Sequence, residues 1–359
     1  MAKRVLFSGY FGFGNTGDEA ILEALCQEVR RQRADVDIAV LLDNQDLAER
    51  LGVEAYPRRQ HREIVKALRK SDLLISGGGG LLQDVTGLGS VVYYLGIVAL
   101  ARTCRVPVAV MCQGFGPVRH PLSKCLVRRL LPLANYASWR DESSVEEVHR
   151  LAPRLRSELS ADPALLLDPV SPKEVAEIRR ANGLQRDYVV VAMRSWRGLY
   201  VENFVYTLSV MLEENPELEL ALLPFQPSQD RQLAHDLAQR LGRFAERVHV
   251  VADLLPRQIL GLVDEAQMVV AMRLHALIFA ASRNVPYVGI AYDPKVASFC
   301  ERSGAPFVYL DKLVNKELEL TWRDAASHRQ ELCEKVASSV EPMRESARRA
   351  ICEALRLLD

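Results

Sequence analysis

The sequence lacks an excess of either charge. Its 359 residues contain 46 Lys and Arg against 46 Asp and Glu, and 26% of the chain is charged. A protein that coats nucleic acid needs a net basic surface, because its affinity comes from neutralised phosphates and released counterions. The balance argues against nucleic acid as a partner, although it leaves room for a local basic patch.

Cysteine patterns that build disulfides or zinc sites are also missing. The seven cysteines are odd in number, are scattered along the chain and form no C-x-x-C pair. The sequence has no H-x-x-x-H or H-E-x-x-H motif either. We therefore expect reduced thiols, as in the cytosol, and no metal site.

Long hydrophobic runs are absent. The longest, Val91–Ala101, has about half of the roughly 20 residues that a membrane-spanning helix needs. The apolar run Val5–Phe7 near the N-terminus is too short for a signal peptide. We expect a cytoplasmic protein, with room for peripheral contact at the inner face of the plasma membrane.

What the sequence does contain is an alternation of short, β-branched runs with longer segments of helical period. This pattern is typical of α/β proteins built from βαβ units with a mostly parallel sheet. The series starts again at residue 188, which predicts two doubly wound domains facing one another across a cleft. We place them at residues 1–168 and 174–322, with C-terminal helices at 323–359. The predicted strands are Val5–Ser8, Asp37–Leu42, Leu73–Ser76, Val108–Cys112, Tyr136–Trp139, Tyr188–Met193, Leu218–Leu223, Val248–Val251, Met268–Met272 and Tyr287–Ala291.

The turn after the first strand is rich in glycine, and ligands of such sheets bind beyond the carboxyl ends of the strands. Residues 12–17 spell G-x-G-x-x-G, and Asp43 ends the next predicted strand, as in dinucleotide-binding proteins. The motif, however, comes several residues after the strand and is unusually polar. It is alternatively a loop for another ligand, or a tight turn in which Asp18 caps a helix over 19–31.

Two further glycine-rich turns and one arginine follow the next predicted strands. Residues 77–80 are four glycines, which leave the backbone open to a ligand, and residues 113–117 form a second such turn. Arg140 follows the fifth strand and has acidic neighbours. It is either half of a weak surface ion pair or an anion clamp in the cleft, and the residues alone leave both open.

Cationic residues follow three strands of the second half. Arg194 comes after the first, Arg273 and His275 come after the fourth where a helix begins, and Lys295 comes after the fifth. A guanidinium binds phosphate or carboxylate through two bonds, and a helix N-terminus adds amides and its dipole. Imidazole exchanges a proton near neutral pH. The pattern predicts an anion site with an acid/base, although a lone histidine is more often a core or surface residue.

A series of motifs runs in order along the chain: GYFGFGNTGDEA, SGGGGLLQD, QGFGP, WRDESS, ADPA at 161–164 and MRLHALIFAASRNVPYVGIAYDPK. Together they resemble the polysaccharide pyruvyl transferase family, and most of all its bacterial cell-wall, CsaB-type members. The similarity runs from the first strand to about residue 310. It implies a GT-B-like pair of Rossmann-type domains. It also implies transfer of a pyruvyl group from phosphoenolpyruvate to two hydroxyls of one sugar, as a cyclic 4,6-ketal, with no further cofactor.

For such members the resemblance implies an N-acetylmannosamine acceptor in a lipid-linked precursor of secondary cell-wall polymer. The ketal is what S-layer-homology domains recognise, and other family members act on galactose or on exopolysaccharide repeats. The resemblance also implies catalytic importance for Arg140, His275 and Lys295. The implied donor-binding residues are Arg194, Arg273, Leu274, His275 and Lys295.

These implied roles lead to a mechanistic hypothesis. We predict that His275 is the acid/base, that Arg273 and Lys295 bind the donor phosphate or carboxylate, and that Arg140 lies near the bond-forming centre. The predicted acceptor-binding residues are Asn15, Asp18, Gly78, Gly79 and Asp84.

Other interpretations stay open at this point. They are a nucleotide-sugar glycosyltransferase, a dinucleotide-binding oxidoreductase and a non-enzymatic sugar-binding module. Two basic segments with interleaved apolar residues, 57–70 and 119–131, are either solvated faces or peripheral membrane patches.

Overall fold

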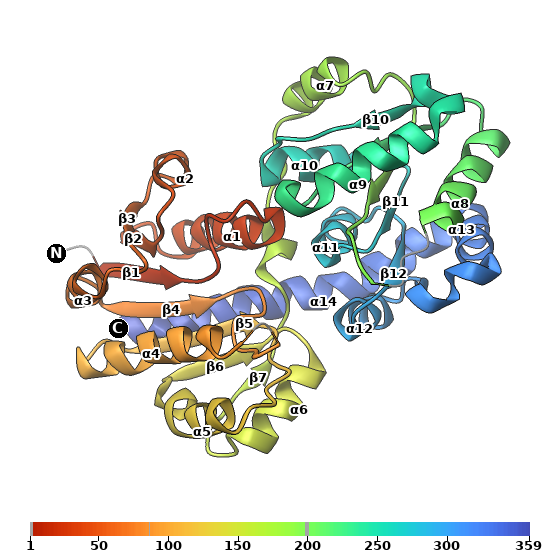
Figure 1. Cartoon of the computed structure of the whole chain (residues 1–359). Coiled ribbons are helices and arrows are strands. Elements are labelled where there is room, and N and C mark those ends of the chain that lie inside the picture. Colours follow the sequence, from red (N-terminus) through yellow and green to blue (C-terminus); the bar gives the residue numbers. More distant parts are fainter. Residues whose placement is uncertain (1–2, 86, 198–200) are drawn as a thin grey trace. The chain divides into compact units, whose positions relative to one another are not determined.

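The computed structural model describes residues 3–85, 87–197 and 201–359 (Figure 1). The chain groups into two compact units. Unit 1 takes the chain up to residue 13, residues 18–167 and residues 343–359, and unit 2 takes residues 14–17 and 168–342. The C-terminal residues therefore divide between the two units after Pro342. The segment predicted as C-terminal helices, 323–359, is helical and contributes to both units.

Unit 1 is built on a seven-stranded parallel sheet in the order β3-β2-β1-β4-β5-β6-β7. The order reverses direction between β1 and β4, as in a doubly wound Rossmann-type domain. Every residue of β4 and β5 is buried, as expected for strands that helices cover on both faces. The strands are β1 (Lys3–Ser8), β2 (Val36–Leu41), β3 (Glu54–Tyr56), β4 (Leu73–Gly77), β5 (Val108–Gln113), β6 (Tyr136–Trp139) and β7 (Glu158–Leu159).

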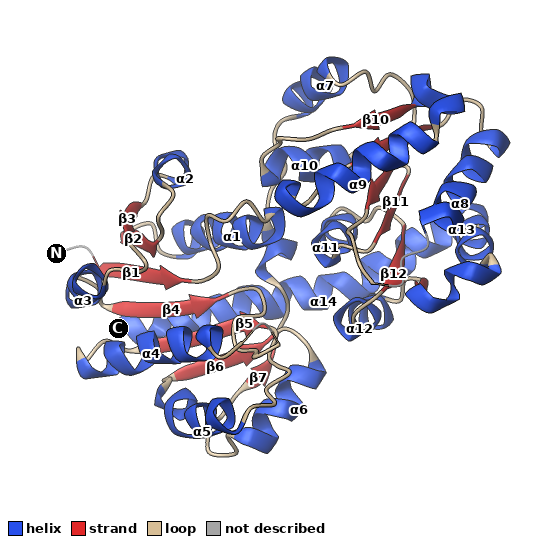
Figure 2. Ribbon diagram, in the orientation of Figure 1, coloured by secondary structure: helices blue, strands red, loops and turns tan. Residues whose placement is uncertain are grey.

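The helices of unit 1 pack along this sheet (Figure 2). A core on one face joins apolar side chains from α3 to α6 with those of the strands. The helix α1 packs with the last part of the chain, where Gln32 Nε2 donates to the carbonyl of Arg348 at 3.2 Å. The helices are α1 (Thr16–Gln32), α2 (Gln45–Leu51), α3 (His61–Arg69), α4 (Gly89–Thr103), α5 (Pro121–Leu130) and α6 (Glu142–Leu151), with the 3-10 segments η1 (Leu131–Leu133), η2 (Pro163–Leu166) and η5 (Arg356–Leu358).

Unit 2 is built on a six-stranded parallel sheet in the order β10-β9-β8-β11-β12-β13, which reverses between β8 and β11. Its strands are β8 (Tyr188–Ala192), β9 (Glu219–Leu222), β10 (Val248–Val250), β11 (Met268–Ala271), β12 (Tyr287–Ala291) and β13 (Phe307–Tyr309). Its helices are α7 (Pro172–Ala181), α8 (Val201–Glu214), α9 (Pro227–Arg240), α10 (Pro256–Asp264), α11 (Leu274–Ser282), α12 (Pro294–Ser303), α13 (Glu317–Ser327) and the part of α14 (Arg329–Leu355) up to Pro342, with the 3-10 segments η3 (Gly242–Arg247) and η4 (Leu310–Asn315).

The predicted fold class of two doubly wound parallel-sheet domains is confirmed. Every predicted strand forms, with ends that differ from the prediction by no more than two residues. The sequence pattern missed β3, β7 and β13, which have two or three residues each and lie at sheet edges. Among the described residues, no helix combines the length and the apolar character needed to cross a membrane.

Candidate functional site

The cationic turns of unit 2 lie at one edge of its sheet. Arg194 follows β8, Arg273 and His275 follow β11, and Lys295 follows β12. These three strands are neighbours and run parallel, so their carboxyl ends reach the same edge. The predicted anion-binding residues are thus brought together beside the β8/β11 reversal, where ligands of doubly wound sheets bind.

Arg273 is buried and has a carboxylate partner. Its Nε lies 2.9 Å from Oδ2 of Asp230 and its Nη2 lies 2.5 Å from Oδ1, which is a bidentate ion pair. Its Nη1 donates to the side chain of Gln226 at 3.3 Å. Because Asp230 lies in α9 and Arg273 directly precedes α11, this pair ties the two helices together. The structure therefore gives Arg273 a packing role that its predicted donor-binding role did not include.

Arg194 has a different environment. Its Nη1 donates to the hydroxyl of Tyr292 at 2.9 Å, and its guanidinium carbon lies 4.9 Å from the ring centre of Trp196 and 5.0 Å from that of Tyr292. Its Nε is buried without a hydrogen-bond partner, and no carboxylate forms an ion pair with Arg194 among the described residues. Stacking on two aromatic rings does not neutralise a guanidinium, so its positive charge can still bind an anion.

His275 and Lys295 both lie in the first turn of a helix. Leu274 and His275 are the first two residues of α11. A Cβ atom added to Gly17, which belongs to the same unit, would lie 2.0 Å from Nδ1 of His275, so only a glycine fits against this ring. In α12 the carboxylate of Asp293 caps the helix by accepting from the amide of Lys295 at 2.9 Å.

In unit 1, the glycines after β4 are needed for packing. Gly78 and Gly79 have φ values of +77° and +64°, which favour glycine. A Cβ atom on Gly78 would lie 2.1 Å from Cγ2 of Ile21, and one on Gly79 would lie 2.6 Å from Oδ1 of Asp18. Two of these glycines therefore let α1 approach the turn, which the sequence analysis had assigned to ligand access.

The helix after the first strand begins earlier than predicted. It starts at Thr16, three residues before the predicted start at 19, so Asp18 lies inside the first turn and does not cap it. Asn15 provides the local turn instead, because its Oδ1 accepts from the amide of Gly17 at 3.1 Å. The side chain of Asp18 lines a cavity of unit 1.

Asp84 holds a loop. Its carboxylate accepts from the amide of Arg119 at 2.9 Å and from that of His120 at 2.8 Å, just before α5. Burial would raise the pKa of this carboxyl group, but these bonds outweigh burial and lower the pKa below its usual value. The predicted contact between Asp84 and an acceptor hydroxyl would have to compete with these amides.

Arg140 pairs with two carboxylates, and one of them belongs to its neighbour in the sequence. Its Nε lies 3.8 Å from Oδ2 of Asp141. Its Nη1 lies 2.7 Å from Oδ2 of Asp162, and both side chains are buried. Burial opposes the charge of Arg140, but Asp162 and Asp141 outweigh burial and hold its pKa above the usual arginine value. The guanidinium packs directly against Gly114, where an added Cβ atom would lie 3.0 Å from its Nε. Asp162 belongs to the ADPA motif, whose role the sequence alone had not shown.

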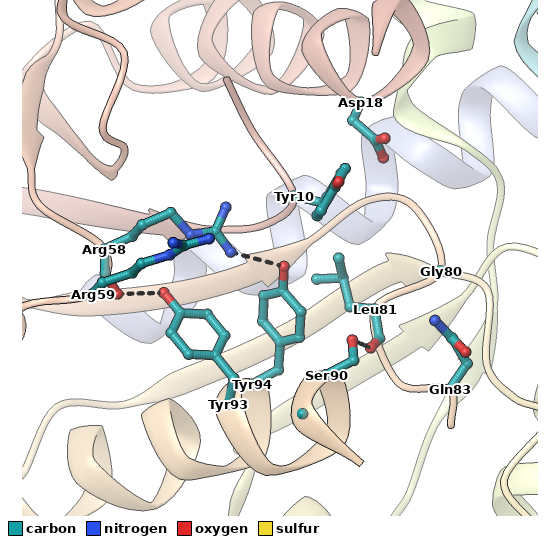
Figure 3. Close-up of a pocket in the computed structure, with 11 residues that line it drawn as sticks. Tyr10, Asp18, Arg58, Arg59, Gly80, Leu81, Gln83, Ser90, Tyr93 and Tyr94 are labelled. Carbon is teal, nitrogen blue, oxygen red and sulfur yellow. Dashed lines mark hydrogen bonds between the residues drawn. The ribbon is translucent and has the colours of Figure 1, made fainter. Parts of the chain in front are cut away.

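A cavity of about 470 Å³ opens in unit 1 beside the β1/β4 reversal (Figure 3). It combines two arginines, three tyrosines and one carboxylate. The lining residues are Tyr10, Asp18, Arg58, Arg59, Gly80, Leu81, Gln83, Gly89, Ser90, Tyr93 and Tyr94. Sequence analysis found Asp18 here and missed the tyrosines, and it assigned Arg58 and Arg59 to a solvated or membrane-facing segment. The adjacent tyrosines in an apolar helix were the available signal.

The residues that suggested a dinucleotide have other contacts. Oδ1 of Asp43 accepts from the amide of Arg58 at 3.1 Å and so fixes a loop. Gly12 and Gly14 have φ values of +80° and +69°, which explains both as turn glycines. Within the described ranges, no group of three or more His, Cys, Asp or Glu side chains is placed to hold a metal ion.

Comparison with known families decides the assignment. The family model described as polysaccharide pyruvyl transferase matches residues 15–294. The chain belongs to this family. The match includes Arg194, Arg273 and His275 of the cationic turns and the glycine-rich turn after β4, and it supports a transferase. No curated protein matches the chain.

Solved structures with the same fold span the whole chain. The Staphylococcus aureus protein MnaA, solved with UDP, has a TM-score of 0.67 at 12% identity and covers 100% of this chain and 97% of its own. HepE from Anabaena, solved with UDP-glucose, has a TM-score of 0.65 at 12% identity, covering 98% and 99%. The UDP-GlcNAc 2-epimerase of Neisseria meningitidis has a TM-score of 0.64 at 13% identity, covering 99% of each chain. These likenesses show a GT-B-like fold and do not favour a nucleotide-sugar activity.

Proposed function

We propose that the protein transfers the pyruvyl group of phosphoenolpyruvate to two hydroxyls of one sugar and releases phosphate. The proposed product is a cyclic 4,6-ketal on N-acetylmannosamine in a lipid-linked precursor of secondary cell-wall polymer, a group that S-layer-homology domains would then bind. The observation that carries the proposal is the family match over residues 15–294.

The chemistry requires one proton shuttle and several positive charges. One sugar hydroxyl attacks C2 of the donor while the methylene carbon C3 gains a proton and becomes a methyl group. Phosphate then leaves, and the second hydroxyl closes the ring at C2. The two hydroxyl protons are balanced by the new methyl C–H bond and by the protonated phosphate product, so the transfer needs no oxidant.

The residues of unit 2 suit the donor. Phosphoenolpyruvate carries about two negative charges on phosphate and one on carboxylate. We assign one anionic group to Arg194, which has no carboxylate partner among the described residues, and another to the first turn of α12 with Lys295. His275 is our proposed acid/base, and the Arg273–Asp230 pair positions it by fixing the start of α11.

The proposed acceptor residues are Asp18, Gly78, Gly79 and Asp84 of unit 1 together with Asn15, and Asp18 is the one whose side chain lines the cavity. We keep Arg140 as a group near the bond-forming centre, where Asp162 would set its orientation.

The test is a reaction with defined substrates. The protein would be incubated with phosphoenolpyruvate and a synthetic acceptor disaccharide on a short-chain diphospho-lipid. We expect release of one phosphate for each acceptor that gains the mass of a pyruvyl ketal, without competition from UDP or GDP. Phosphate release without a mass gain on the sugar, or transfer from a nucleotide sugar, would contradict the proposal.

A lipid-linked acceptor would also bring the protein to a membrane surface. The helix α5 within segment 119–131 carries Arg128 and Arg129 and leaves Leu122 47% exposed. We propose this helix as a peripheral contact, and co-sedimentation with anionic liposomes tests it. Binding that 0.5 M salt does not weaken, or no binding, would contradict it.

A further inference from the structure

Arg58 in unit 1 is a buried cation with unused hydrogen-bonding capacity. It is 6% exposed, and its guanidinium carbon lies 4.7 Å from the ring centre of Phe13 and 5.2 Å from that of Tyr93. Its Nη2 donates to the hydroxyl of Tyr94 at 3.3 Å. Its Nη1 is buried without a hydrogen-bond partner, and Arg58 lines the cavity.

The charge of Arg58 has no carboxylate partner among the described residues. The nearby Asp43 accepts from the backbone amide of Arg58, and no ion pair joins its carboxylate to the guanidinium. Arg59, the next residue, is exposed and lines the same cavity. A buried guanidinium without a counter-charge is costly, and two adjacent arginines suit an anion with several oxygens.

The rest of the cavity suits a sugar. The rings of Tyr10, Tyr93 and Tyr94 offer apolar faces to the cavity. The hydroxyl of Tyr93 donates to the carbonyl of Arg58 at 2.8 Å, and that of Tyr94 accepts from the Arg58 side chain. Figure 3 shows both arginines on one side and Asp18 with Gln83 on the other. The cavity therefore has a cationic end for an anionic group and a polar end that can accept and donate hydrogen bonds to hydroxyls.

We propose that this cavity binds a sugar that carries a phosphate or diphosphate ester, with the ester on Arg58 and Arg59 and the sugar hydroxyls towards Asp18. The proposal rests on the proposed function, because the lipid diphosphate of the acceptor has this chemistry, and it names the part of the acceptor that the enzyme recognises. Arg58 and Arg59 are then residues that set acceptor specificity.

Arg58 differs from the other Lys and Arg residues of segment 57–70, which the sequence predicted to be a solvated face or a membrane patch. Those other residues are exposed, whereas Arg58 is buried. Arg62 in α3 does not line the cavity. Arg62 is therefore a matched control that removes the same charge four residues away.

The experiment measures binding without turnover, so it stands even if pyruvyl transfer fails. Isothermal titration calorimetry would use the short-chain acceptor diphosphate, the same disaccharide as its methyl glycoside, phosphoenolpyruvate and inorganic phosphate. Arg58→Gln and the exposed Arg59→Gln are expected to weaken binding of the diphosphate by about 10- to 100-fold each, the usual effect of losing a charge-assisted bond. Binding of the methyl glycoside and of phosphoenolpyruvate should stay within about twofold of wild type.

Several results would overturn the proposal. One is unchanged diphosphate binding by Arg59→Gln. Because the side chain of Arg59 is exposed, this variant should fold normally, and its binding tests the cavity directly. Others are an equal loss with Arg62→Gln, which would indicate general surface charge, and a selective loss of phosphoenolpyruvate binding, which would make this the donor site. Inorganic phosphate binding as tightly as the diphosphate would show a phosphate site with no sugar component.

Discussion

Oδ2 of Asp162 lies 2.7 Å from Nη1 of Arg140, and both side chains are buried in unit 1. The pair joins the end of β6 to the ADPA segment, where Oδ1 of Asp162 also accepts from the amide of Ala164 at 3.0 Å. Without the charge of Asp162, the guanidinium of Arg140 would keep the longer 3.8 Å pair with Asp141 and lose its closest counter-charge. We expect Asp162→Asn to lower the free energy of unfolding by about 3 to 5 kcal/mol.

Urea unfolding followed by fluorescence measures this loss. Asp35→Asn is the control, since Asp35 pairs with Arg33 on the surface, where solvent screens the interaction. The control should unfold with the wild-type midpoint. Equal midpoints for all three proteins would mean that the Arg140–Asp162 pair adds no stability.

Substitutions of the two arginines at the proposed anion-binding edge of unit 2 should have different effects. Arg273→Gln leaves the buried carboxylate of Asp230 without its partner, so we expect a loss of about 3 to 5 kcal/mol in the free energy of unfolding. Arg194→Gln should instead keep stability within about 1 kcal/mol and weaken phosphoenolpyruvate binding by about 10- to 100-fold. Urea unfolding and calorimetry measure the two effects.

A double variant sharpens the test of Arg273. Because the two side chains share one interaction, Arg273→Gln combined with Asp230→Asn should lose less stability than the sum of the single changes. If Arg273→Gln is as stable as wild type but no longer binds phosphoenolpyruvate, the guanidinium of Arg273 binds the donor and its ion pair with Asp230 does not stabilise the fold.

The sequence predicted the central strands and missed three of the four edge strands for a physical reason. Strands such as β5 are buried along their whole length, and this produces a continuous apolar run in the sequence. The edge strands β3, β7 and β13 have only two or three residues, and none of them is buried along its whole length. These strands are held by hydrogen bonds to neighbouring strands, and no local pattern of apolar residues in the sequence reveals those bonds.

The site could be predicted in part. Arg194 and His275 could be found because parallel strands deliver the residues that follow them to one edge. Partners distant in the sequence could not: Asp230 precedes Arg273 by 43 residues, and nothing in its surroundings marks it as a counter-ion. Arg58 was missed because its burial depends on rings from two other segments.

Three cysteines should be inert towards alkylation in the folded protein. Burial raises the pKa of Cys26, Cys112 and Cys300 to about 12 each. Only the thiolate reacts, so at pH 8 about one thiol in 10,000 is reactive, and each further pH unit raises that fraction about tenfold. Iodoacetamide at pH 8 followed by peptide mass spectrometry should therefore modify other cysteines first, such as the half-buried Cys104 and Cys125.

Unfolding in urea provides the control for the thiols. All seven cysteines should then react at similar rates, because burial no longer raises any thiol pKa. Rapid modification of Cys112 in the native protein at pH 7 would show that its environment is open to solvent.

A substitution of His275 should slow the chemical step and leave the binding of phosphoenolpyruvate nearly unchanged. It lies in the first turn of α11, and the structure fixes that turn through the neighbouring Arg273–Asp230 pair. If His275 moves the proton, His275→Ala should lower kcat by about 100- to 10,000-fold, while calorimetry gives a phosphoenolpyruvate affinity within about threefold of wild type. His235→Ala, an exposed histidine on α9 of the same unit, is the control and should keep full activity. A change confined to KM would make His275 a binding residue, because an acid/base acts on the transition state and a binding contact is already made with the bound substrate.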